Sequence, residues 1–276
     1  MAKESLTDQE IKAKIIANSQ QTSKAENKFP TEIVPLPSKG LVYPEGHPLT
    51  SGKVEIKYMT AKEEDILTNN NLLKAGKALD KLYESLLIGN GEGQPVNINE
   101  MITGDKSALM LATRVLGYGP EYKVTLNDDS GEPFEHIVDL NELKVKDVDY
   151  SLYKNSRELK YTLPVSNIDI VFKLRNSKED AILAKEIGRL QKAGRPAGIT
   201  TTLKHTIVEI DGNRESKFIN EFVDMHLLAK DSLSLRAYIA LNTPDYNLNV
   251  FIDRPEKGIQ QDMQIPIDIN FFWPRL

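Results

Sequence analysis

Two stretches decide the fold: Lys57-Tyr-Met-Thr-Ala-Lys-Glu-Glu-Asp-Ile-Leu67 and Lys173-Leu-Arg-Asn-Ser-Lys-Glu-Asp-Ala-Ile-Leu183. Five of the 11 aligned positions are identical, at an offset of 116 residues. The first stretch contains Thr60-Ala-Lys-Glu63, a capping box that predicts the start of a helix. Just before it, Val54 and Ile56 alternate with polar residues, which is typical of a half-buried strand. Each stretch therefore predicts a strand that leads into a helix.

Further matches follow in the same order, and their offset grows from 118 to 129. The matched pairs are Leu72–Gly76 with Leu190–Gly194, Ile98–Ile102 with Ile219–Val223, Pro120–Tyr122 with Pro244–Tyr246, and Val138–Asn141 with Ile267–Asn270. Small insertions in loops explain a slowly growing offset. The sequence therefore predicts an internal duplication, roughly 54–141 and 170–270.

The fold class that follows is α+β, with a strand–helices–β-hairpin unit present twice. The helices expected in the first repeat are 61 onward, 72–87, 97–102 and 105–116, with Asp105 as a cap. Its hairpin joins Tyr122–Leu126 to Phe134–Leu140 through Asp128-Asp129-Ser130-Gly131. The second repeat is expected to contain helices over 215–227 and 231–241, and strands over 247–252 and 263–269.

The segment Thr200–Ile210 is rich in Thr, Ile and Val, which is typical of a strand. Its counterpart in the first repeat is the predicted helix around 79–87, and Ile199, Leu203 and Ile207 have helical spacing. We therefore expect a helix here, with Asp211-Gly212 as the turn that ends it.

Composition narrows the class of protein. The chain has 276 residues, 35 basic and 40 acidic side chains, a net charge of −5, and no cysteine. Zero cysteine excludes a disulfide scaffold, a thiolate nucleophile, an iron–sulfur cluster and a thiolate zinc site. Mild acidity argues against a protein that coats nucleic acid. No apolar run approaches the roughly 18 residues of a membrane span, and no secretory signal is present.

The predicted domains are a flexible polar tail (1–28), an extended proline-rich segment with the first repeat (29–150), and the second repeat with a C-terminal aromatic strand (151–276). In the tail, Leu6, Ile11, Ile15 and Ile16 fit a short amphipathic helix. The alternative is a frayed tail that becomes ordered when it binds a partner.

Catalytic and metal-binding motifs are not apparent. The four histidines, His47, His136, His205 and His226, have no metal-ligand spacing. Ser151-Leu-Tyr-Lys154 has the spacing of a serine acylase but lacks the accompanying motifs. Gly89-Asn-Gly-Glu-Gly93 follows a helix and leads into a proline, so it does not form a phosphate loop. We expect no catalytic, cofactor or metal site.

Two features remain as candidates for interaction or for closing the fold. The first is a turn built from Leu36, Pro37, Lys39, Gly40, Tyr43 and Pro44, in which the prolines and Gly40 specify the backbone. The second is Phe271, Phe272, Trp273 and Pro274. Consecutive aromatics on a strand point to both faces, so both faces must be covered. Either the C-terminal aromatics pack under the proline-rich segment, or both features form an assembly interface.

The turn, the Thr60–Glu63 helix start and the terminal aromatics resemble the baseplate hub and hub-assembly proteins of T-even-type contractile-tailed bacteriophages. This resemblance runs from about Pro35 to Pro274. It implies a non-enzymatic role in tail assembly, other hub or tail proteins as partners, and no cofactor. It also implies a location in the host cytoplasm during assembly and in the virion if the protein stays in the particle; self-association is left open.

Two other functions stay open at this point. An enzyme would place its site in the cleft between the repeats, with His136, His205 and nearby carboxylates as candidates. A weak nucleic-acid-binding module would use Arg189, Lys192, Arg195 and Lys204. The acidic residues interleaved with these cations favour a solvated helix face instead.

Overall fold

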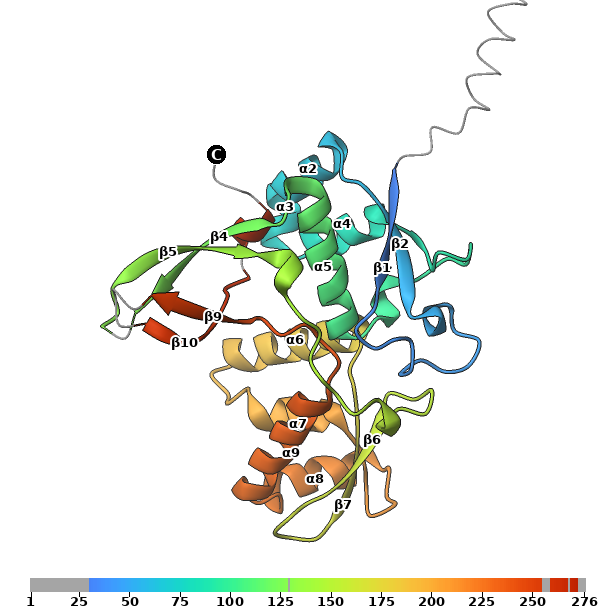
Figure 1. Ribbon diagram of the computed structural model, residues 1–276. Coiled ribbons are helices and arrows are strands. Elements are labelled where there is room, and N and C mark those ends of the chain that lie inside the picture. The colour runs from blue at the N-terminus through green and yellow to red at the C-terminus, as the bar shows by residue number, and fades with distance from the viewer. Residues whose placement is uncertain (1–29, 129, 255–258, 268, 273–276) are drawn as a thin grey trace, which may run out of the picture. The chain divides into compact units, whose positions relative to one another are not determined.

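The computed structural model describes residues 30–128, 130–254, 259–267 and 269–272. The predicted tail 1–28, together with Trp273 and Pro274, lies outside these ranges. Residues 32–276 form one compact unit, which is the unit described below. The described part of the chain combines helices with small sheets of two or three strands (Figure 1), which confirms the α+β class.

The first repeat contains two sheets and several helices (Figure 1). Its elements are β1 (Thr31–Pro35), η1 (Pro48–Ser51), β2 (Lys53–Lys57), α2 (Ala61–Thr68), α3 (Asn70–Lys74), α4 (Ala78–Leu86), β3 (Leu87–Gly89), η2 (Ile98–Glu100), α5 (Thr103–Tyr118), β4 (Glu121–Asn127) and β5 (Pro133–Asp139). Two 3-10 turns, η3 (Leu140–Glu142) and η4 (Tyr150–Leu152), lead to the second repeat.

The elements of the second repeat are β6 (Glu158–Thr162), β7 (Asp169–Lys173), α6 (Ser177–Lys192), α7 (Ile199–Thr206), β8 (Ile207–Ile210), α8 (Ser216–Met225), α9 (Ala229–Asn242), β9 (Asn249–Arg254) and β10 (Ile259–Gln264), followed by η6 (Ile269–Phe272). Their order is similar to that of the first repeat, with one helix, α6, in the place of α2 and α3, and a helix, α8, in the place of η2. The sheet orders are β1-β2-β3 and β6-β7-β8, and each repeat ends in a two-stranded hairpin.

The backbone confirms the duplication in detail. The register of the β2–β3 pair shifts between Glu55 and Ile56, and that of the β7–β8 pair shifts between Val171 and Phe172. These two positions are related by the same offset of 116 residues as the sequence match. The repeats were predicted to begin at about residues 54 and 170, which lie in β2 and β7. In the structure, each three-stranded sheet contains one earlier strand as well, β1 in the first repeat and β6 in the second.

A left-handed glycine ends the first helical stretch in each repeat. Gly76 and Gly194 have φ values of +64° and +66°. The next residue's amide donates to the carbonyl of Leu72 in one repeat and of Leu190 in the other, each at 2.9 Å. This is the bond pattern of a Schellman motif, which terminates helices. The predicted continuous helix over 72–87 is therefore wrong, because Gly76 separates α3 from α4.

Other helix predictions need correction too. The segment 97–102 forms only the 3-10 turn η2. Helix α5 begins at Thr103, so Asp105 is its third residue and not its cap. Segment 200–210 divides into α7 and β8, so both the helix and the strand interpretation hold in part. Asp211 and Gly212, both left-handed, turn the chain after a strand and do not end a helix.

The hairpins follow the predicted alternation. In β4, Tyr122, Val124 and Leu126 are buried, and they pair across from β5 as expected. Strands β9 and β10 pair over 249–254 and 259–264, so the second strand lies earlier than the predicted 263–269. The terminal aromatics Phe271 and Phe272 belong to the 3-10 turn η6 and not to a strand. Buried residues of both repeats belong to one hydrophobic cluster.

Candidate functional site

The predicted turn at Leu36–Pro44 is fixed by a buried carboxylate. Asp105, fully buried in α5, accepts hydrogen bonds from the Ser38 amide (2.9 Å), the Ser38 hydroxyl (2.7 Å) and the Tyr43 hydroxyl (2.6 Å). The Tyr43 hydroxyl in turn accepts from the Ile102 amide at 3.1 Å. Burial raises the pKa of Asp105 to about 6, although these hydrogen bonds oppose the rise. The turn is thereby tied to the start of α5.

The second repeat contains an equivalent carboxylate that sequence reasoning missed. Asp231 is the third residue of α9, as Asp105 is of α5, and it is also fully buried. It accepts from the amides of Val165 (2.8 Å) and Ser166 (3.1 Å). Burial acts to raise the pKa of Asp231, but these amide hydrogen bonds outweigh it and hold the pKa below its ordinary value. We call Asp105 and Asp231 the loop-anchoring aspartates.

The two anchored loops differ mainly in length. Both start with a buried leucine followed by proline, Leu36-Pro37 after β1 and Leu163-Pro164 after β6. The Leu36 amide donates to the Gly52 carbonyl and the Leu163 amide to the Ile168 carbonyl, each at 2.9 Å. Fifteen residues (37–51) lie between the first pair and four (164–167) between the second. The two Leu-Pro dipeptides are the sequence signal from which the equivalence of these two loops could have been predicted.

The remaining turn residues are largely enclosed. Leu36, Pro37, Gly40 and Tyr43 are buried, whereas Lys39 and Pro44 are exposed. A Cβ atom on Gly40 would lie 2.5 Å from the Thr50 carbonyl oxygen, so only glycine fits there without a backbone shift.

Lys39 has an aromatic partner outside the turn. Its ammonium lies 3.8 Å from the centroid of the Tyr150 ring, and the Tyr150 hydroxyl donates to the Pro37 carbonyl at 2.9 Å. Both contacts connect the turn to η4.

Two of the C-terminal aromatics, Phe271 and Phe272, lie in the part of the chain that the structure describes. Phe271 and Phe272 are buried, at 0% and 2% exposure. The Phe271 ring lies edge-on to Tyr122 (centroids 5.0 Å apart) and to Phe272 (5.2 Å). The contacts described for the turn instead go to Asp105, Ile102 and Tyr150.

The matched helix starts carry matched ion pairs. Glu63 and Glu179 each accept from the lysine six residues earlier, Lys57 and Lys173, at 2.8 Å. Each also closes its capping box by accepting, at 3.0 Å, from the amide of the N-cap residue. Burial opposes ionisation at both sites, but these donors lower the pKa of each glutamate to about 2.

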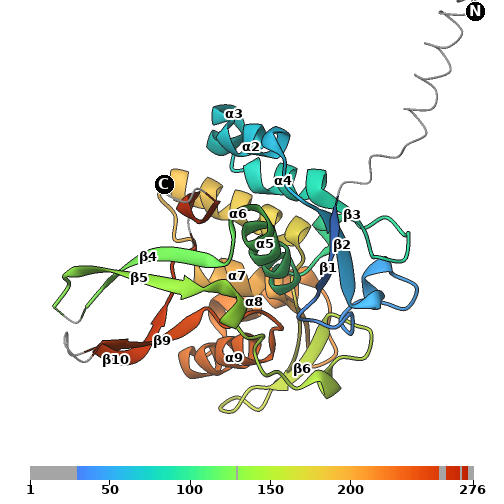
Figure 2. The same cartoon turned by 45° about the horizontal axis from the view of Figure 1, so that its top comes forward.

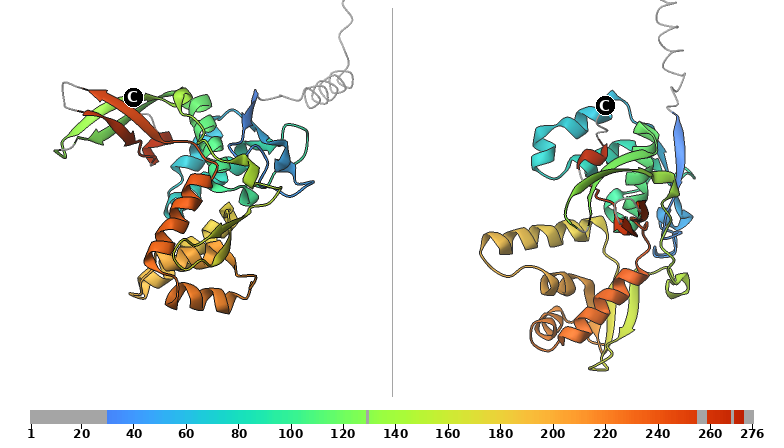
Figure 3. Two further views of the ribbon diagram at one scale, coloured as in Figure 1. Left: turned by 60° about the horizontal axis from the view of Figure 1, so that its bottom comes forward. Right: turned by 60° about the vertical axis from the view of Figure 1, so that its left-hand side comes forward.

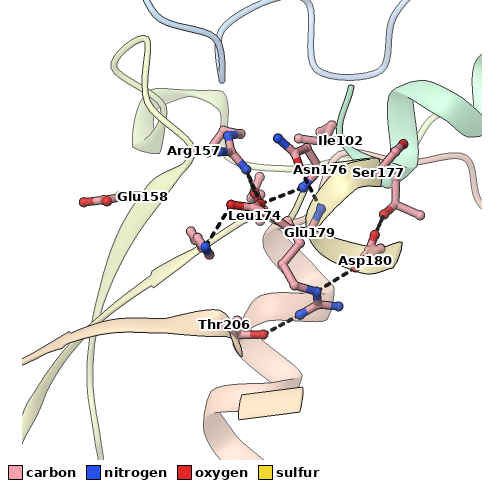
Figure 4. Close-up of polar contacts among 12 residues, drawn as sticks. Ile102, Arg157, Glu158, Leu174, Asn176, Ser177, Glu179, Asp180 and Thr206 are labelled. Atoms are coloured by element: carbon pink, nitrogen blue, oxygen red, sulfur yellow. Dashed lines mark hydrogen bonds and ion pairs between the residues drawn. The ribbon is translucent and has the colours of Figure 1, made fainter. Parts of the chain in front are cut away.

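The second capping box has a further cation. Figure 4 shows Arg157 and Asn176 converging on Glu179. Arg157 Nη1 lies 2.6 Å from Glu179 Oε2. Beside it, the Arg175 guanidinium joins Asp180 to Thr206. These contacts fix α6 against β7 and α7.

The histidines are dispersed. His47 pairs with Glu100 at 2.9 Å, and His205 pairs with Glu186 at 2.7 Å. Within the described ranges, no three His, Asp or Glu side chains are grouped to hold a metal ion. The helices in those ranges are also too short or too polar to cross a membrane.

Comparison with known proteins gives the family. The family model described as T4 bacteriophage base plate protein matches residues 41–272. The chain belongs to this family. The match covers both repeats, from the middle of the Leu36–Pro44 turn to the end of η6. No curated protein and no solved structure matches the chain. The protein is a phage baseplate protein, with a structural or assembly role in the tail.

Proposed function

We propose that this baseplate protein acts in the assembly of the hub, as a hub component or as a hub-assembly factor. It works through contacts with other hub or tail proteins and without catalysis. In this proposal it binds its partners in the host cytoplasm, and it enters the virion if it is a component. We propose three parts: a tail (1–28), an entry segment with the first repeat (29–150), and the second repeat with the C-terminal aromatics (151–276). In this proposal the two repeats present the contacts.

The observation that supports this proposal most directly is the exposed surface of the two hairpins. Strands β5 and β9 come from different repeats and lie side by side in Figures 1 and 2. Residues of both strands line a hollow of about 390 Å³. Ile137 on β5 and Phe251 on β9 line it and are each 60% exposed. Large exposed apolar side chains of this kind favour a protein partner.

The proposal is tested with the full-length protein in phage-infected cells. Replacing both Ile137 and Phe251 by serine removes apolar contact area without touching buried residues. We expect the double variant to fold but to co-purify less with the other baseplate proteins. Leu241→Ser, at a position 70% exposed on α9, is the matched control. Undiminished co-purification of the double variant would contradict this part of the proposal.

Two further measurements separate the remaining choices. Mass spectrometry of mature particles distinguishes a hub component, present at a defined copy number, from an assembly factor found only in precursors. Deleting residues 1–28 tests whether the tail docks on a partner. We expect weaker partner binding and an unchanged thermal unfolding midpoint; equally tight binding by the truncated chain would exclude docking by the tail.

A further inference from the structure

Helix α6 carries a stripe of positive charge along its outer face. The stripe consists of Lys178, Lys185, Arg189 and Lys192, with Ile182 between them, and we call these five residues the cationic stripe. All five are exposed, Ile182 by 51%. At about 100° per residue they fall within roughly 80° of the helix circumference, over about 20 Å of its length. The right-hand view of Figure 3 shows α6 as one long straight helix.

The acidic residues of α6 do not neutralise this stripe, because each has a partner elsewhere. Glu179 binds Lys173 and Arg157. Asp180 binds Arg175 at 2.7 Å and accepts from Thr103 at 2.7 Å. Glu186 pairs with His205. The charges of α6 are therefore segregated by side, on a face that is exposed to solvent.

The structure also changes which cations act together. Lys204, which the sequence grouped with Arg189, Lys192 and Arg195, pairs with Asp224 at 2.6 Å. Lys178 and Lys185 take its place, because they share the face of Arg189 and Lys192.

One flank of the cationic stripe is made of small residues. Ala181, Ala184 and Gly188 lie three and four residues apart, next to the stripe on the helix surface. A Cβ atom on Gly188 would meet nothing within 4 Å. Small side chains let a second helix approach closely, to interaxial distances near 8–10 Å.

We infer that the cationic stripe, with its small-residue flank, binds an acidic helix of another tail protein. The inference rests on the proposed function, since it names the chemistry of one partner. Charge complementarity selects an acidic partner, and Ile182 together with the flank favours a protein helix over a nucleic acid. A phosphate backbone offers no apolar contact to Ile182 and gains nothing from the small-residue flank.

The test measures binding of the full-length protein to defined probes. The first probe is a helical peptide of about 20 residues with glutamates along one face, long enough to stay helical on contact. The second is the same peptide with glutamine at those positions, and the third is mixed-sequence duplex DNA. We expect binding to the glutamate peptide that weakens with added salt, and no comparable binding to the glutamine peptide or to DNA.

The decisive variant reverses three charges of the stripe: Lys185→Glu, Arg189→Glu and Lys192→Glu. We expect its affinity for the glutamate peptide to fall about tenfold or more. The matched control reverses Lys62, Lys74 and Lys154, which are also exposed, and makes the same change in net charge. We expect the control to retain its affinity, and circular dichroism checks that both variants are folded.

Four results would overturn the inference. Equal losses in both variants would show a response to net charge alone. DNA binding as tight as peptide binding would favour the nucleic-acid alternative. Equal binding of both peptides would rule out charge recognition. Unimpaired co-purification of the stripe variant with other baseplate proteins would leave the proposed function intact while the stripe inference fails.

Discussion

At the scale of single residues, the loop-anchoring aspartates determine the path of the two loops that follow β1 and β6. Each carboxylate is buried away from water, and amides of its loop donate the hydrogen bonds that water would otherwise supply. A buried acceptor without donors, or donors without their acceptor, costs about 1–3 kcal/mol of stability, and more if a charge is involved. The two sites differ in one respect that is measurable. Burial raises the pKa of Asp105 to about 6, whereas the pKa of Asp231 lies below its ordinary value.

We predict that Asp105→Asn changes how stability depends on pH. The folded protein holds the Asp105 proton more tightly than the unfolded chain, where the pKa is near its ordinary 3.8. This contribution to the free energy of unfolding is full below pH 3.8 and is lost as the pH rises through about 6. The wild type should therefore lose on the order of 2 kcal/mol relative to Asp105→Asn over that window.

Urea denaturation at a series of pH values measures this difference, and Asp231→Asn is the matched variant. Because the pKa of Asp231 is lowered on folding, its contribution is present above pH 3.8 and is lost as the pH falls below that value. A constant stability difference between wild type and Asp105→Asn from pH 4 to 6 would refute the prediction.

We predict that Glu63→Gln destabilises the protein by about 3 kcal/mol at neutral pH. The substitution removes the buried negative charge that accepts from the Lys57 ammonium, and it weakens the bonds from the Thr60 and Ser85 hydroxyls. With a pKa of about 2, Glu63 contributes stability that is present above pH 4.5 and is lost as the pH falls toward 2. Denaturant titration at pH 7 and pH 3 checks this; a loss no greater at pH 7 than at pH 3 would argue against it.

At the scale of elements, two glycines inside helices have opposite surroundings. A Cβ atom on Gly104, in α5, would lie 1.8 Å from the Pro244 carbonyl oxygen, next to the chain that leads into β9. Gly188, in α6, has open space around the same position. Gly104 therefore permits a close crossing of the two repeats, while Gly188 has no such packing role.

We predict opposite effects for the same substitution at these sites. Gly104→Ala should lower the free energy of unfolding by about 3 kcal/mol, because backbone must move to admit the methyl group. Gly188→Ala should raise it by about 0.5–1 kcal/mol, because alanine favours the helix. Thermal and urea unfolding of both variants measure the difference; a loss of stability in both would show that the α6 glycine is also enclosed.

The elements also show what a sequence can and cannot predict here. Short-range chemistry, such as the Thr60–Glu63 capping box and the β4 alternation, depends on neighbours in the chain and was predicted correctly. The loop-anchoring aspartates were missed, since Asp105 meets Ser38 only across 67 residues. The α7–β8 boundary was missed because strand pairing with β7, and not local propensity, ends the helix after Thr206. The charge segregation of α6 likewise depends on distant partners of its carboxylates.

At the scale of the whole molecule, the two repeats share backbone bonds. The Ser177 amide donates to the Met101 carbonyl at 2.9 Å, which joins the start of α6 to the segment before α5. Lys146 and Asn247 donate, each at 2.8 Å, to carbonyls of the other repeat. The hydrophobic cluster is continuous through both. Each repeat therefore packs against the other through hydrogen bonds and through a shared hydrophobic core.

We predict that residues 32–276 unfold in a single cooperative transition. Hydrogen exchange followed by mass spectrometry should show peptides from β2 and β7 losing protection at the same urea concentration. Separate expression of 29–150 and 151–276 should give fragments less stable than the intact chain, because each exposes part of the shared core. Two resolved transitions would show that the repeats are independent domains.

The two anchored loops also bear on how the duplicated chain arose. Whatever both copies possess was present in the single ancestral unit: the capping box, the shifted strand register and the aspartate that holds the Leu-Pro loop. The longer loop, with Tyr43 bonded to Asp105, occurs in only one copy, so the two copies have diverged in this loop. The two repeats are more similar in backbone geometry than in side-chain identity. Relatives of the single unit should therefore be searched for by comparing structures and not sequences.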